Sequence, residues 1–170
     1  MSTEATPATA ETPSASSNAD ALIRRHTVYS MAAGLVPLPL VDIAAVTGVQ
    51  VKMLGDVCEA YGQDFDAERT RSVIASLLAT VSGISLGRGV VASLVKAIPV
   101  VGTIGGMAAV PVMAGATTYA LGRVFAAHFE SGGTLLTFDA AKMKDEFKRQ
   151  IKVGEGVAES LKAEVAAAKK

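Results

Sequence analysis

The chain has 170 residues, and its 16 basic and 16 acidic side chains give a formal net charge of zero. This length fits one domain with tails, and the balanced charge excludes a bulk electrostatic attraction to nucleic acid. The single cysteine, Cys58, excludes an internal disulfide and a cysteine-based zinc site.

Residues 1–19 are expected to form a disordered tail. Ser, Thr, Ala and Pro dominate this segment, and its only charges are acidic. It holds too little apolar surface to offset the entropy of ordering, and it lacks the basic and apolar regions of a signal peptide. Two interpretations stay open: a solubilising leader without a specific role, or a docking or targeting segment.

A first helix is expected over residues 20–35. Strand signals and aromatic residues are scarce after Asp20 and alanine is abundant, so the whole remaining chain is predicted to be helical. Asp20 can serve as the N-cap. Pro37 and Pro39 should end this helix, because the residue before a proline is pushed out of helical geometry.

A second helix should begin near Pro39, whose fixed φ suits the first helical turn, and run to Tyr61. Gly62 is expected to cap its end in the left-handed conformation. Asp42 is the one charge within residues 27–51. Two interpretations stay open for it: an ionisable group inside a membrane segment, which would be functional, or a first-turn carboxylate that interacts with free backbone N–H groups.

A third helix is predicted to begin after Asp66, a suitable N-cap, with Glu68 in its first turn. Its sequence continues as an uncharged run, and the glycines that follow predict a break near Gly87. A further helical piece over residues 90–97 should lead to Pro99.

Residues 97–122 form a run of 26 residues without a charge. A bilayer-spanning helix needs about 20 apolar residues, so this run is either the best inserting segment or the packed centre of a helical bundle. Pro111 should kink or divide it. Gly102 and Gly106 form a small-xxx-small pair, which lets helices approach closely in either setting. The helix should end at the Ser-Gly-Gly sequence of residues 131–133.

Residues 134–170 are charged and mixed in sign. They are predicted to form one or two exposed amphipathic helices, broken at Gly154 and Gly156. The overall expectation is an all-α fold. Apolar, Gly/Ala-rich helical hairpins with about four core helices should occupy residues 20–133, followed by this charged C-terminal helical segment.

The residue types that carry chemistry form no recognisable catalytic or metal motif. His26 and His128 are about 100 residues apart and lack the spacing of a metal site. No orienting motif surrounds Cys58, so a buried structural cysteine is favoured over a nucleophile. The sequence therefore predicts no enzyme, and we assign it no catalytic residue, metal or cofactor.

A string of residues between positions 32 and 133 resembles a known family. Its elements are Pro37-Leu-Pro39, Asp42, Gln50, Tyr61-Gly62, Pro99, Gly102, Thr118, Gly122 and Phe129-Glu130. In this order and spacing they are similar to the YcjF-like, GTPase-associated domain of unknown function. The resemblance implies a small helical domain that is associated with a membrane and is fused to, or encoded near, GTPases of the Era type. It implies no catalytic residues.

The GTPase itself is missing from this sequence. No GxxxxGK[ST] phosphate loop occurs. The nearest glycine cluster, residues 102–106, lacks the lysine and the preceding strand, and its spacing does not fit the GxGxxG dinucleotide motif. The chain is therefore the associated domain alone, and it cannot bind GTP through that motif.

These features predict a non-enzymatic, membrane-associated helical module at the inner membrane of a bacterium. It would recruit or regulate a separate GTPase, or another protein, through its charged C-terminal helix or its tail. The alternatives are a self-assembling membrane or scaffold protein, with homo-oligomers formed through glycine-lined helices, and a soluble all-helical adaptor in the cytoplasm. The candidate functional or structural residues are Pro37, Pro39, Asp42, Gln50, Tyr61, Gly62, Pro99, Gly102, Gly106, Thr118 and Gly122.

Overall fold

The computed structural model describes residues 14–35, 41–82 and 104–168, and within these ranges every regular element is a helix. The predicted all-α class is therefore confirmed. The helices, in chain order, are α1 (Ala15–Ala33), α2 (Val41–Ala60), α3 (Ala67–Ser82), α5 (Ile104–Glu130) and α6 (Lys144–Ala168).

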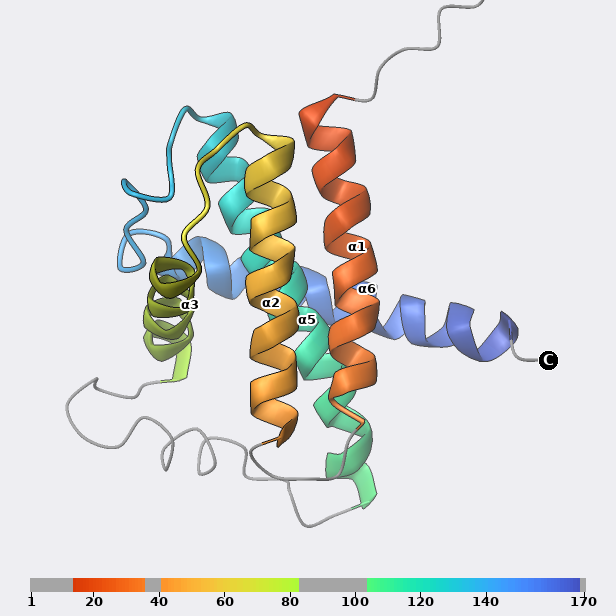
Figure 1. Ribbon diagram of the computed structural model, residues 1–170. Helices are drawn as coiled ribbons and strands as arrows, with labels where there is room; N and C mark the ends of the chain where they lie inside the picture. The colour runs from red at the N-terminus through yellow and green to blue at the C-terminus, as the bar shows by residue number, and fades with distance from the viewer. Residues whose placement is uncertain (1–13, 36–40, 83–103, 169–170) are drawn as a thin grey trace, which may run out of the picture.

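Helix α5 is the centre of the fold. It makes extensive contacts with α1 and α6 and also touches α2. Figure 1 shows α1 and α2 side by side, α5 behind them, and α6 running across the bundle. The largest fully buried side chains come from all five helices, so they share one core. They include Ile23, Met53, Leu54, Ile74, Leu77, Leu121, Phe125 and Phe147.

Helix α1 begins five residues earlier than the sequence predicts. The Ser14 side chain is the N-cap and accepts a hydrogen bond from the backbone N–H of Ser17 at 3.2 Å. The expectation that Asp20 caps this helix is wrong, and residues 15–19 are helical. The reason is tertiary, because Ala19 and Ile23 lie one turn apart on the face that the core buries.

Three other predicted helix boundaries are confirmed: the end of α2, the start of α3 and the end of α5. Helix α2 stops at Ala60, and Gly62 follows with a φ of +62°. Asp66 caps α3, because its carboxylate accepts a hydrogen bond from the backbone N–H of Arg69 at 2.6 Å. Helix α5 ends before Gly132, whose φ is +83°. Glycine adopts these left-handed conformations without a steric penalty.

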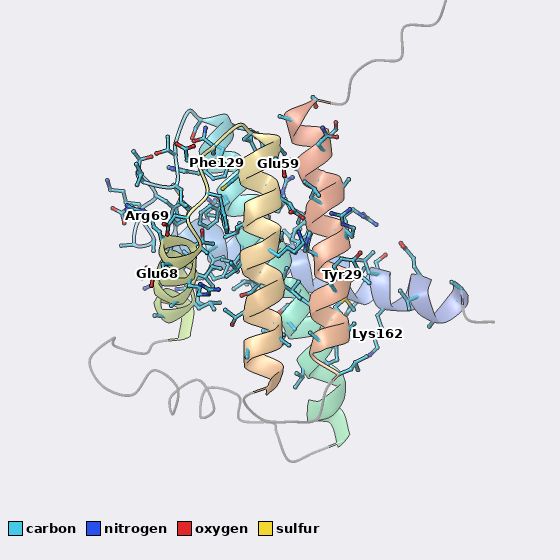
Figure 2. All side chains as sticks on the ribbon, in the orientation of Figure 1. Tyr29, Glu59, Glu68, Arg69, Phe129 and Lys162 are labelled. Atoms are coloured by element: carbon cyan, nitrogen blue, oxygen red, sulfur yellow. The ribbon has the colours of Figure 1, made fainter. Side chains whose placement is uncertain are left out.

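Arg69 also holds the connection between α5 and α6. Its guanidinium donates hydrogen bonds to the carbonyl oxygens of Leu135, at 3.3 Å, and Leu136, at 3.0 Å. Arg69 lies at the start of α3 (Figure 2), so this edge helix is tied to the loop as well as to the core.

Pro111 does not divide α5, which is one helix of 27 residues. A proline removes a hydrogen bond from a helix and normally breaks it. Here Pro111 is buried where the end of α1 approaches α5 closely, and a Cβ added to Gly34 would lie 3.3 Å from the Pro111 Cα. Packing against the neighbouring helices stabilises the helical conformation despite the proline.

Helix α6 is continuous, so the predicted breaks at Gly154 and Gly156 are wrong. The predicted amphipathic character is present, because α6 is exposed on one side and buries a stripe that includes Phe147, Ala158 and Leu161. Gly154 belongs to this stripe. A Cβ at that position would lie 2.7 Å from the backbone oxygen of Ala116 in α5, so the glycine serves helix contact rather than a break.

Several predictions fall outside the described residues. They are Pro37, Pro39, Pro99, Gly102, the break near Gly87, the helical piece over residues 90–97 and most of the N-terminal tail. Asp42 lies in the first turn of α2 and Gly106 lies near the start of α5.

In the described part of the chain, no helix has both the length and the apolar character needed to cross a membrane. For residues 104–122, which lie in α5, the expectation of a transmembrane helix is therefore not supported.

The two glycines of α6 should respond oppositely to alanine. G154A should lower the free energy of unfolding by about 1–3 kcal/mol, because the methyl group meets the α5 backbone, which cannot move aside cheaply. G156A should raise it by up to about 1 kcal/mol, because its position is open and alanine favours a helix. Urea unfolding of both variants tests this. Equal midpoints would contradict the close α5–α6 contact.

Candidate functional site

A buried network of hydrogen-bonded polar side chains connects α2, α5 and α1. The Gln50 side-chain amide donates a hydrogen bond to the Thr118 hydroxyl oxygen at 3.2 Å. The Thr118 hydroxyl in turn donates to the Ser30 hydroxyl oxygen at 2.7 Å. All three side chains are at most 2% exposed. The structure thus brings together Gln50 and Thr118, which the sequence had selected separately.

Ser30 is the member of this network that the sequence analysis did not predict. The signal was present in α1, where the polar residues Thr27 and Ser30 lie on the face that also buries Ile23. In the described residues, no histidine or carboxylate bonds to Ser30 or Thr118, so neither hydroxyl has a general base beside it. A buried hydrogen-bonded network of this kind favours one register of the helices against each other.

A second polar contact joins the ends of α2 and α5. The Tyr61 hydroxyl donates a hydrogen bond to a Glu130 carboxylate oxygen at 2.7 Å, and the Tyr61 ring packs against Phe129. Burial, reinforced by this hydrogen bond, raises the pKa of Tyr61 to about 12. The bond from Tyr61 is also the main cause that lowers the pKa of Glu130 below its ordinary value.

A third cluster links α1 to α2 around Asp56. The buried His26 ring places Nε2 3.4 Å from the Asp56 carboxylate, and Nδ1 lies 2.9 Å from the Leu22 carbonyl oxygen. A carbonyl oxygen only accepts, so Nδ1 is the donor there. Arg25 and Lys52 reach the same carboxylate at 3.5 and 3.0 Å. The Asp56 carboxylate is thus contacted by side chains from both α1 and α2 at the interface between these helices.

The second histidine has a separate structural role. His128 lies beside the carbonyl oxygen of Thr134, 3.0 Å from Nε2, and packs edge-on against Phe138. Over the described ranges, no three residues of the types that bind metals come together. Cys58 is a free, buried thiol, and burial raises its pKa to about 11. It is therefore protonated at neutral pH and is a poor nucleophile.

The glycines of α5 bring that helix close to α1. A Cβ at Gly122 would lie 2.5 Å from Cγ1 of Ile23, and one at Gly115 would lie 2.6 Å from Cγ of Met31. Gly122 therefore packs against a helix of the same chain. This face of α5 is not available for self-association.

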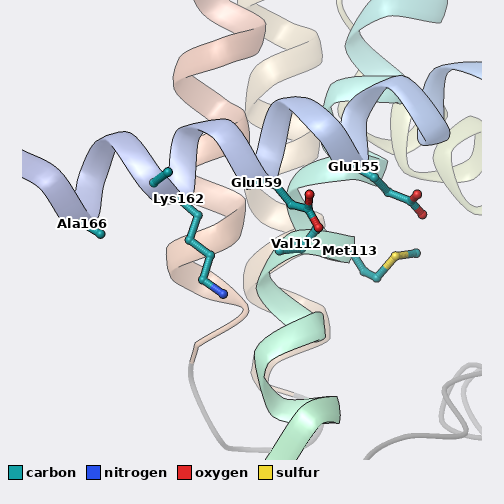
Figure 3. Close-up of a pocket in the computed structure, with 7 residues that line it drawn as sticks. Val112, Met113, Glu155, Glu159, Lys162 and Ala166 are labelled. Atoms are coloured by element: carbon teal, nitrogen blue, oxygen red, sulfur yellow. The ribbon is translucent and has the colours of Figure 1, made fainter.

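One open groove lies between α5 and α6 (Figure 3), with a volume of about 660 Å³. Its floor is apolar and its rim is charged. The lining residues are Val112, Met113, Glu155, Glu159, Lys162, Ala163 and Ala166. Sequence reasoning did not find it, because the two helices meet only in the folded chain.

The chain is similar to proteins of one family. The model of a domain of unknown function (DUF697) matches residues 11–154. A protein called magnetosome membrane protein 22, from Magnetospirillum gryphiswaldense, is 43% identical over 150 residues, which cover 88% of this chain and 77% of that protein. No solved structure matches the chain significantly.

The buried polar network should contribute to the stability of the fold through Thr118. T118V leaves both Gln50 and Ser30 without their partner, so the free energy of unfolding should fall by about 1–3 kcal/mol. T117V is the matched control, because the neighbouring hydroxyl bonds only to carbonyl oxygens of its own helix, and it should cost less than about 1 kcal/mol. Urea unfolding measures both. Equal losses would contradict a special role for the network.

The Tyr61–Glu130 contact should be visible in a pH titration. Glu130 has a folded-state pKa below its ordinary value of 4.5. Its ionised form therefore stabilises the fold above about pH 4.5, and this contribution is lost as the pH falls through the lowered pKa. In Y61F the Glu130 pKa should move back towards 4.5, as followed by NMR of the side-chain carboxyl carbon. An unchanged pKa would show that the hydrogen bond does not form in solution.

Proposed function

The chain belongs to the DUF697 family, and on this premise we propose that it is a non-enzymatic helical module that associates with a membrane and recruits or regulates a separate GTPase. The observation that carries the membrane half of the proposal is the 43% identity to a protein named as a magnetosome membrane protein. The similarity spans 150 residues, most of both chains.

The non-enzymatic part of the proposal is supported by how the polar side chains are used. Gln50, Thr118 and Ser30 bond to one another in the core, and the Asp56 carboxylate is engaged by groups from α1 and α2. Such groups stabilise helix contacts rather than face an open cavity. Cys58 is buried and protonated.

An exposed side of α6 offers a contact for an anionic membrane surface. Lys144, Lys148 and Lys152 are exposed and follow one another at intervals of four residues, so they lie on one side of the helix. No ion pair holds any of these three ammonium groups within the described residues. A local basic stripe can attract anionic lipid although the net charge of the chain is zero.

The GTPase part of the proposal is supported by sequence features. The string from Pro37 to Glu130 resembles the GTPase-associated domain, and the chain has no phosphate loop of its own. In this proposal the GTPase is a separate protein that the module recruits or regulates. Because α6 contributes Phe147 and Leu161 to the core, deletion of α6 would unfold the module. Point substitutions on its exposed face are the proper test.

Binding to vesicles tests the membrane half. The full-length protein should float with vesicles that contain phosphatidylglycerol and should stay behind with neutral phosphatidylcholine vesicles. Each basic residue near an anionic surface contributes about 1 kcal/mol, so K148E/K152E should weaken binding at least about thirtyfold. R24E/R71E reverses two exposed arginines on α1 and α3 and should have a much smaller effect. If the wild-type protein does not float with the vesicles, membrane association is refuted.

Co-purification tests the proposed GTPase partner. The tagged full-length protein is cross-linked in its native membranes and then isolated. The expected result is a co-purified protein with a GxxxxGK[ST] motif whose GTP hydrolysis changes when the module is added. A module that floats with vesicles but retains no such protein would leave the membrane half standing and remove the GTPase half.

A further inference from the structure

The α6 side of the groove is a regular stripe of side chains. Glu155, Glu159, Lys162 and Ala166 follow one another at intervals of four, three and four residues. This spacing keeps side chains on one face of a helix and is the pattern through which helices pair. Figure 3 shows Glu155, Glu159 and Lys162 directed to the same side as Val112 and Met113 of α5.

The charges of this stripe have no ionic partner among the residues that the structure describes. Within the described residues, Glu155, Glu159 and Lys162 form neither an ion pair nor a side-chain hydrogen bond. Glu155 and Glu159 are four residues apart, and like charges at that spacing repel each other. Beside them, the Met113 side chain is 44% exposed. The groove therefore combines uncompensated charge with an open apolar floor.

The stripe is complementary to itself. It is symmetric about the point between positions 160 and 161, where the charged pair Glu159 and Lys162 flanks the midpoint. If two α6 helices pair antiparallel about this point, Glu159 of each copy faces Lys162 of the other, twice. Glu155 of each copy then faces Ala166 of the other, and small side chains such as Ala163 and Ala166 allow close approach. Such a twofold contact is the commonest way in which identical chains associate.

We infer that this groove is the contact through which two copies of the chain form an antiparallel α6–α6 dimer. Charge complementarity selects the second copy as the occupant, because the stripe supplies both signs at matching positions. The geometry also favours it. From residue 162 to residue 168 every side chain of α6 is exposed, and Figure 1 shows the end of this helix extending beyond α1. The partner would cover this projecting end.

The proposed dimer surface is distinct from the glycines that α5 places against α1. Gly115 and Gly122 face Met31 and Ile23 of the same chain, so they are already occupied. The dimer requires neither a membrane nor a GTPase, and its failure would leave the proposed function untouched.

Sedimentation equilibrium of the full-length protein, without vesicles, tests the dimer. The wild type should sediment as a dimer at micromolar concentration. E159K and K162E each place like charges opposite one another, and each should weaken dimerisation at least tenfold. E164K is the matched control, because Glu164 is exposed on the same helix but lies off the stripe, and it should remain dimeric.

Two combinations separate a specific pairing from a general loss of association. The double variant E159K/K162E exchanges the two charges and should dimerise like the wild type. A mixture of E159K with K162E should form a heterodimer, although each alone is monomeric. Each variant's thermal unfolding curve, measured at a concentration where the protein is monomeric, should match that of the wild type because both side chains are exposed. A monomeric wild type, dimers that persist in both single variants, or no rescue by the charge exchange would each overturn the inference.

Discussion

The fold depends on how closely α5 approaches its two neighbours. Gly122 and Gly115 bring it against Ile23 and Met31 of α1, and Gly154 of α6 lies over the backbone of Ala116. At each point the glycine has no side chain, so the facing helix packs directly against its backbone. Close approach of this kind increases dispersion contacts over the whole interface, which individually are weak and collectively large. A helix rich in Gly and Ala, with a proline inside it, can therefore be the centre of a stable core.

Close packing creates a requirement for the polar groups that it buries. Gln50, Thr118 and Ser30 are removed from water, and each would be costly to bury without a partner. They satisfy one another only when α1, α2 and α5 have one particular register. The apolar contacts thus supply most of the stabilisation, while this network discriminates against helices that slide or rotate. The contacts of Tyr61 with Glu130 and of His26 with Asp56 add the same discrimination at other points along these helices.

Local features of the structure were predictable wherever neighbouring residues determine them. Gly62 and Asp66 act as helix caps because their roles depend on backbone geometry within a few residues. Predictions failed where a distant segment decides the outcome. Gly154 and Pro111 look like helix breakers in sequence, yet both lie within continuous helices because neighbouring helices pack against them. Asp20 was a plausible cap, but burial of Ala19 extends α1 back to Ser14.

The sequence by itself determined the helical class and the absence of a phosphate loop, and it predicted Gln50, Tyr61 and Thr118 as separate candidate residues. These properties follow from composition, from motifs and from residue order. Only the tertiary structure decided that Gln50 bonds to Thr118, that Ser30 completes this buried network, and that a groove lies between α5 and α6. The physical reason is that these contacts join residues up to 88 positions apart. Helical periodicity specifies which face of a helix is buried, but not which other helix covers it.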